Sequence, residues 1–107
     1  MRSVRVFVAG HKGMVGSALV RSLKKKKKLR IITVDKKKLN LINQKNVQTY
    51  FERNKFDQVY LSAAKVGGIY ANNTFPGEFI YENIMIQANV INSAFLTGVK
   101  KLLFLGS

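Results

Sequence analysis

Four short apolar runs alternate with three segments of helical periodicity along this chain of 107 residues, and this alternation constrains the fold more than any other feature. Runs that are apolar on both faces are typical of strands buried in a parallel sheet. The order β-α-β-α-β-α-β therefore predicts an α/β fold with right-handed crossovers. We expect the strands at residues 4–9, 30–34, 57–63 and 102–105.

Each predicted helix carries an apolar stripe. The first contains Met14, Val15, Ala18, Leu19 and Leu23, with Arg21 and Lys24 opposite; the second spans 44–54; the third runs from Pro76 to about Phe95. In the third, Ile80, Ile84, Ile91 and Phe95 mark one face, and Phe79, Ile86 and Val90 widen it, so we expect it to be covered on more than one side. Four strands make about half of a doubly wound fold, which predicts a partial Rossmann-type parallel sheet that ends at its fourth strand.

Composition excludes several classes of site. The chain has no cysteine and one histidine, so disulfides, thiolate nucleophiles and Cys- or His-ligated metals are not expected. No apolar run approaches the roughly 18 residues of a membrane span, and no export signal is recognisable. We therefore expect a cytoplasmic protein with no metal and no membrane partner.

The loop between the first strand and the first helix has the pattern Gly-x-x-Gly-x-x-Gly, formed by Gly10, Gly13 and Gly16. The first glycine permits a tight exit from the strand, the second allows backbone to approach a pyrophosphate, and the third lets the helix pack closely on the sheet. A helix N-terminus at this place favours phosphate. The pattern predicts a dinucleotide site, with an ordinary strand-to-helix turn as the alternative.

Sequence blocks along the whole chain resemble one family, the GDP-L-fucose synthases of the extended short-chain dehydrogenase/reductases (NAD-dependent epimerase/dehydratase family). These blocks are Arg5–Ala18, Asp57–Ile69, Ala71–Pro76, Phe79–Asn83 and Lys101–Ser107. Ala-Lys-Val-Gly-Gly-Ile and Ala-Asn-Asn-Thr-x-Pro carry most of the specificity, because a generic dinucleotide fold does not require them. The resemblance implies that residues 1–107 are the amino-terminal part of an NAD(P)-binding Rossmann domain, with the substrate domain absent.

The resemblance also implies which residues hold the cofactor. The glycine loop, composed of Gly10, His11, Lys12, Gly13, Met14, Val15 and Gly16, would hold the pyrophosphate. Lys36 matches a basic position of the family, and Lys36–Lys38 would attract a 2′-phosphate. Asp35 lies near the offset of about 20 residues at which an acid binds the ribose 2′-hydroxyl instead. NADP(H) is favoured and NAD(H) stays open because of Asp35.

The remaining site residues follow the carboxyl ends of strands. Asn40 and Leu41 match the stretch near the adenine. Ala63 and Ala64 match the part that approaches the ribose and nicotinamide, with tight core packing as the alternative. Leu105, Gly106 and Ser107 match the fourth-strand exit, where the family has a catalytic Ser that orients the keto oxygen of the substrate.

The Tyr-x-x-x-Lys pair of the family is missing, because no tyrosine here is followed by lysine four positions later. We therefore expect the NADP(H)-binding portion of a nucleotide-sugar epimerase/reductase that converts GDP-4-keto-6-deoxy-mannose to GDP-L-fucose, inactive by itself. The nucleotide sugar would bind only in a complete enzyme. Self-association or a missing carboxyl-terminal half is the expected partner, and the alternative is a standalone nucleotide-binding or regulatory module that pairs with another chain.

The formal charge of +14 at first suggests a nucleic-acid partner. Ten of the nineteen basic residues lie between Arg21 and Lys38, where Asp35 alone opposes them. The run Lys24–Lys28 is expected to close the first helix and lacks the interleaved aromatics of single-strand binding. We expect nonspecific adhesion to nucleic acid at low salt and no dedicated nucleic-acid function.

Overall fold

A computed structural model describes residues 3–10, 14–62 and 76–104 of the chain. Four parallel strands form one sheet in the order β2-β1-β3-β4. The elements are β1 (Val4–Ala9), α1 (Met14–Lys24), β2 (Leu29–Ile32), α2 (Gln44–Asn54), β3 (Gln58–Leu61), α4 (Pro76–Leu96) and β4 (Lys101–Phe104). The predicted α/β fold with a doubly wound parallel sheet is confirmed.

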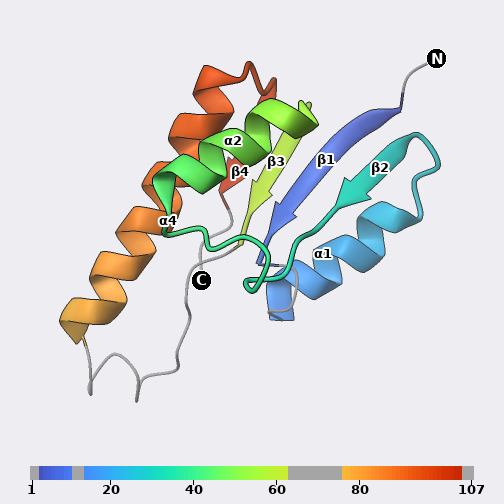
Figure 1. The fold of residues 1–107 in the computed structure, drawn as a ribbon. Coiled ribbons are helices and arrows are strands. Elements are labelled where there is room, and N and C mark those ends of the chain that lie inside the picture. The colour runs from blue at the N-terminus through green and yellow to red at the C-terminus, as the bar shows by residue number, and fades with distance from the viewer. Residues whose placement is uncertain (1–2, 11–13, 63–75, 105–107) are drawn as a thin grey trace.

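Helices cover both faces of the sheet (Figure 1). Because successive side chains of a strand point to opposite faces, β1 contributes to two cores. Val6 and Val8 pack with Leu23 of α1, whereas Phe7 and Ala9 pack with α2 and α4 on the other face. The central strand is therefore buried on both sides, as its continuous apolar sequence predicts.

Aromatic rings fill the core between β1 and α2. The ring of Phe7 stacks on that of Phe56 at 4.8 Å and meets that of Phe51 edge-on at 5.5 Å. Helix α2 begins at a side-chain cap, in which Asn43 Oδ1 accepts a hydrogen bond from the backbone N–H of Asn46. The helix ends at Asn54 and is followed by Lys55, whose φ of 52° is left-handed. The ring contacts hold α2 against the sheet, and the two caps fix where the helix begins and ends.

Strand boundaries differ slightly from the sequence-based ranges. Strand β2 begins at Leu29 and ends at Ile32, so Thr33 and Val34 lie outside it. Strand β4 begins one residue earlier than expected, at Lys101. The pairing sets these limits, since Leu29 is opposite Val4 and Lys101 is opposite Gln58.

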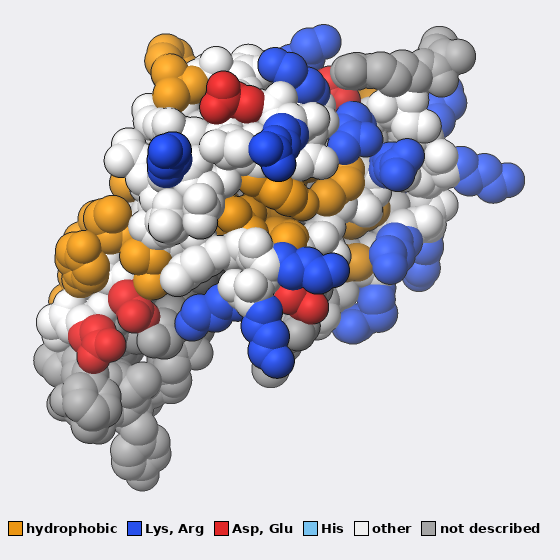
Figure 2. All heavy atoms as spheres, viewed as in Figure 1, with side chains coloured by type: hydrophobic (Ala, Val, Ile, Leu, Met, Phe, Trp, Pro, Cys, Tyr) orange, Lys and Arg blue, Asp and Glu red, His pale blue; other side chains and the backbone are white. Residues whose placement is uncertain are grey.

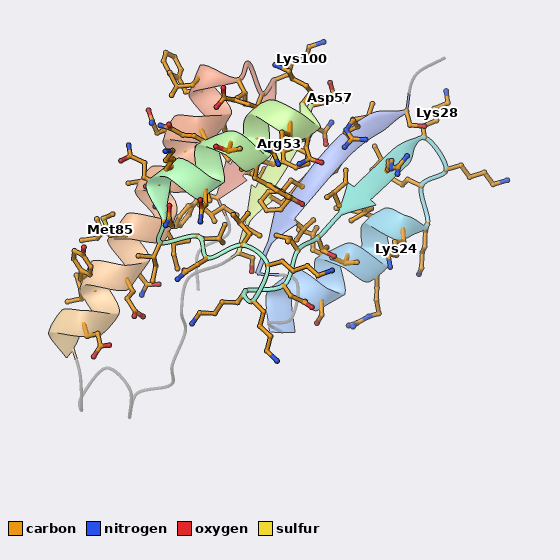
Figure 3. All side chains as sticks on the ribbon, viewed as in Figure 1. Lys24, Lys28, Arg53, Asp57, Met85 and Lys100 are labelled. Atoms are coloured by element: carbon orange, nitrogen blue, oxygen red, sulfur yellow. The ribbon has the colours of Figure 1, made fainter. Side chains whose placement is uncertain are left out.

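The lysine run does not close the first helix as expected. Helix α1 ends at Lys24, and Lys25–Lys28 form the exposed turn that leads into β2. The turn is short because Lys26 N–H donates to the Leu23 carbonyl and Leu29 N–H donates to the Lys26 carbonyl. Figure 3 shows Lys24 on the helix and Lys28 beside the start of β1.

Within the described residues, helix α4 is covered on one face. Ile86, Val90 and Ala94 are buried against the sheet and α2. The stripe expected as its main apolar face is instead exposed, with Ile84 58% and Phe95 81% accessible. Figure 2 shows hydrophobic side chains gathered at the surface over this helix. The prediction that α4 is covered on more than one side is therefore wrong for the described chain.

Candidate functional site

The first strand leaves the sheet through a glycine in a conformation that other residues avoid. Gly10 follows β1 and has a φ of 87°, in the left-handed region. Helix α1 begins four residues later and has no acid in its first turn, while Gly16 is buried. An acid-free helix N-terminus beside a glycine exit suits a phosphate group. The described part of the loop therefore fits a dinucleotide.

Three lysines lie on the surface of the turn that follows β2. Lys36, Lys37 and Lys38 are exposed, while Asp35 is half-buried. The turn is tight because the Asp35 carbonyl accepts hydrogen bonds from Lys38 N–H at 2.9 Å and Leu39 N–H at 3.0 Å. The lysines consequently project from the carboxyl edge of β2, on the side of the sheet where the glycine exit also lies.

The segment after this turn is anchored to the core on one side and open on the other. Leu39 is buried, and Leu41 packs against the core formed by the sheet, α2 and α4. Asn40 is exposed, and its Oδ1 accepts a hydrogen bond from Ile42 N–H at 3.1 Å. The structure thus presents Asn40 outward and Leu41 inward. Of these two proposed adenine-side residues, Asn40 has the more accessible side chain.

Many predicted site residues lie outside the described parts of the chain. These are His11, Lys12, Gly13, Ala63, Ala64, Leu105, Gly106 and the proposed catalytic Ser107. Met14 and Val15 open helix α1, but their side chains are also not described. Ser62 N–H donates to the Ala9 carbonyl at 2.9 Å, so β1 and β3 remain paired up to the residue before Ala63.

Sequence reasoning missed the residue that ties this region to α4. Asn89 is buried and donates hydrogen bonds from Nδ2 to the carbonyl oxygens of Leu41 at 2.8 Å and Ile42 at 2.9 Å. A signal was available, because Asn89 interrupts the apolar spacing between Ile86 and Val90. A polar residue on the covered face of a helix indicates a specific hydrogen-bond partner.

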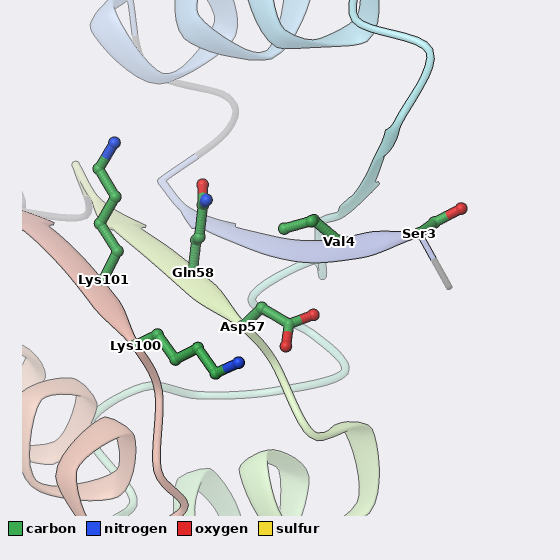
Figure 4. A pocket seen from close by; sticks show the side chains of 6 residues that line it. All are labelled: Ser3, Val4, Asp57, Gln58, Lys100 and Lys101. Carbon is green, nitrogen blue, oxygen red and sulfur yellow. The ribbon is translucent and has the colours of Figure 1, made fainter. Parts of the chain in front are cut away.

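A shallow pocket lies at the opposite, amino edge of the sheet. Figure 4 shows Asp57 and Lys100 pointing toward one another across it. It is lined by Ser3, Val4, Asp57, Gln58, Lys100 and Lys101. Ligands of open α/β sheets bind at the carboxyl ends of strands, so this pocket is not the dinucleotide site.

Among residues 3–10, 14–62 and 76–104, no group of three His, Cys, Asp or Glu side chains is placed to hold a metal ion. The described helices include none with both the length and the apolar character needed to cross a bilayer.

A parallel sheet with helices on both faces, a left-handed glycine exit and an acid-free helix N-terminus define a Rossmann-type dinucleotide-binding fold. The chain belongs to the NAD dependent epimerase/dehydratase family, whose family model matches residues 6–107.

Proteins similar to the chain include enzymes named for GDP-sugars. It is 50% identical over 107 residues to GDP-L-fucose synthase of Escherichia coli K12, covering 100% of this chain and 33% of that protein. The structure of DdhaC has a TM-score of 0.94 and 47% identity, covering 100% of this chain and 31% of that one. MlghC, a GDP-mannoheptose C4 reductase from Campylobacter jejuni with NADP bound, has a TM-score of 0.90 and 40% identity, covering 99% and 33%. The chain thus spans about a third of the length of these proteins.

Proposed function

We propose that this chain is the NADP(H)-binding portion of a nucleotide-sugar epimerase/reductase of the GDP-L-fucose synthase kind. The observation that carries the proposal is the left-handed Gly10 exit leading into an acid-free helix start, next to the exposed lysine turn. Similarity over about a third of the length of GDP-L-fucose synthase and of an NADP-bound reductase supports the same assignment. A cytoplasmic location is part of this proposal.

Electrostatics favour NADP(H) over NAD(H). A 2′-phosphate carries about two negative charges, which Lys36, Lys37 and Lys38 can neutralise from an exposed turn. Asp35 opposes them with one charge, and it is half-buried rather than fully displayed. Three accessible cations therefore outweigh one carboxylate at this edge of the sheet.

The residues of this chain would bind and orient rather than complete a reaction. The N-terminus of α1 and the glycine loop would hold the pyrophosphate, and Asn40 and Leu41 would lie at the adenine. Bound NADPH supplies a hydride for a keto carbon. Ser107 would orient the keto oxygen by donating a hydrogen bond to it. The chain has no Tyr-x-x-x-Lys pair, so proton donation requires residues from a carboxyl-terminal portion.

Calorimetric titration of the chain with NADPH and NADH tests the proposal. We expect NADPH to bind more tightly, and Lys36→Ala to weaken NADPH about tenfold, the equivalent of one charge-assisted hydrogen bond, while changing NADH less than twofold. Lys27→Ala is the control, since it removes the same charge in the turn at the opposite edge of the sheet. Equal loss for both nucleotides would refute the 2′-phosphate role. Binding of neither would refute cofactor binding by this chain.

The exposed edge of the sheet favours a second candidate, a nucleotide-binding module completed by another chain. Strand β4 is the last strand of the described sheet, and Leu102 and Phe104 on it are 39% and 48% exposed. A partner that adds a strand there would pair with the open backbone N–H and C=O groups of β4 and place its own side chains beside Leu102 and Phe104. Cofactor affinity that appears only after mixing with a carboxyl-terminal fragment of a related enzyme would support the missing-half interpretation over the standalone module.

A further inference from the structure

A buried amide connects helix α4 to the proposed adenine-side segment. Asn89 is 4% exposed and lies among apolar residues of the covered face of α4. Its Nδ2 donates two hydrogen bonds, to the carbonyl oxygens of Leu41 and Ile42. Both N–H donors of the Asn89 side chain are thus bonded, each to one of two successive peptide carbonyls. These carbonyls lie almost fifty positions earlier in the chain.

The two carbonyls belong to a segment held at few points. Asn40 Oδ1 accepts from Ile42 N–H, and the Asn40 carbonyl accepts from Asn43 N–H, so residues 40–43 form a local turn. These bonds shape the turn but do not attach it to the rest of the molecule. Attachment comes from the hydrogen bonds of Asn43 to the first turn of α2, from the apolar contacts of Leu41 and Ile42, and from the Asn89 amide.

The direction of these bonds determines what the turn presents outward. Because the Leu41 and Ile42 carbonyls are directed to Asn89, the inner side of the turn is occupied and the Asn40 side chain is left exposed. Apolar packing alone lacks this directionality, since it tolerates small rotations of a peptide unit that a pair of hydrogen bonds does not.

We propose that Asn89 is a positioning residue that holds residues 40–43 in the conformation that receives the adenosine end of the dinucleotide. The inference rests on the proposed cofactor site. Asn89 does not touch the cofactor; it acts through the two carbonyls, and loss of its donors frees the turn to sample other conformations. Adenosine-containing ligands then bind less tightly because they must order the turn on binding.

The first test measures the turn without any ligand. In Asn89→Ala, hydrogen exchange of the Ile42 and Asn43 amides should accelerate at least tenfold relative to amides of β1 and α2. Ser93→Ala is the matched control, since it also truncates a buried polar side chain on the same face of α4, and its Oγ has no hydrogen-bond partner in the described structure. Uniform acceleration across the chain, or none in the turn, would overturn the proposal.

The second test separates the two ends of the cofactor. Asn89→Ala should weaken 2′,5′-ADP about tenfold, the equivalent of one net hydrogen bond, and leave nicotinamide mononucleotide unchanged. Equal weakening of both ligands indicates a general structural role and contradicts positioning. If the unmodified chain binds neither ligand, the proposed function fails, whereas the exchange result still decides whether Asn89 holds the turn.

Asn89→Gln keeps both N–H donors on a longer side chain. This variant should restore most of the exchange protection, and it replaces the alanine variant if that variant does not fold.

Discussion

Arg5 and Asp57 join the amino ends of β1 and β3 through two hydrogen bonds of 2.8 Å. Arg5 N–H donates to Asp57 Oδ2, and Asp57 N–H donates to the Arg5 carbonyl. The Arg5 side chain adds a third bond, from Nε to the Asn54 carbonyl at the end of α2. Figure 3 shows Asp57 at this junction of strands and helix. The pair therefore links β1 to β3 at the amino edge of the sheet, which lies opposite the candidate cofactor site.

Asp57→Ala is expected to lower the free energy of unfolding by about 1–3 kcal/mol, because it leaves a partly buried N–H without its acceptor. Asp57→Asn retains an acceptor oxygen and should cost less. Urea denaturation measures both changes. Glu52→Ala, at an exposed position of α2, is the control and should stay within about 0.5 kcal/mol. A loss as small as that of the control would show that the junction contributes nothing.

A glycine inside α4 and a glycine just after it should respond to alanine with opposite signs. Gly98 ends the helix with a φ of 76°, so Gly98→Ala introduces strain of about 1–2 kcal/mol although the space around it is open. Gly77 lies in the first turn and also has open space, but its φ is not left-handed, so Gly77→Ala should stabilise the chain by up to about 1 kcal/mol. Thermal melts compare the variants. Equal effects would contradict a role for the left-handed conformation.

The exposed apolar face of α4 predicts self-association despite the positive net charge. Ile84 and Phe95 lie on this face and are mostly accessible. Replacing both with lysine should shift the chain toward monomer in sedimentation velocity, with little change in the melting midpoint. Gln44→Lys adds a charge on α2 without removing an apolar side chain and is the control. A parent chain that sediments as a monomer and melts cooperatively would contradict the prediction.

Binding to polyanions should depend on the turn between α1 and β2. Lys25–Lys28 are exposed together, and each anionic group of a polyanion that they neutralise releases a condensed counterion. Changing these four residues to serine should lower the salt concentration needed for elution from immobilised heparin, and reduce the slope of log K against log salt. Changing Lys36–Lys38 to serine removes three charges at the other edge and serves for comparison. Retention that does not vary with salt would contradict an electrostatic origin.

Tyr50 should make stability depend on pH in the alkaline range. Burial raises its pKa above the ordinary value of 10.0, and the nearby Arg5 charge partly opposes this. Above pH 10 the folded state therefore retains a proton that the unfolded state releases, so stability falls as pH rises through the folded pKa. Below pH 10 this contribution does not vary. Tyr50→Phe should show a flatter stability profile above about pH 10 in urea denaturation. The same slope in both proteins would contradict the assignment.

The sequence predicted the elements well where local signals agree. Helix α2 has its predicted bounds of 44–54, and Gly98 follows α4 as expected. Strand β2 was placed too late, because its limits follow from pairing with β1 rather than from the apolarity of Thr33 and Val34. The face of α4 was also misjudged, because Ile84 and Phe95 match a core pattern that periodicity alone cannot distinguish from an uncovered surface.

In the candidate site, too, local patterns were predictable from the sequence and contacts between distant segments were not. The glycine spacing indicated a strand exit and a helix start, and both are found at Gly10 and Met14. Asn89 was not identified as part of this region, because its partners Leu41 and Ile42 are distant in sequence and no local pattern links them.

The sequence by itself determined the alternation of strands and helices, the glycine exit and the lysine turn, because each depends on neighbouring residues and their backbone preferences. The tertiary structure decided which face of α4 is covered, where β2 and β4 begin, and which side chain holds the turn after β2. These depend on contacts between segments far apart along the chain, whose partners are known only when the sheet and its helices are packed.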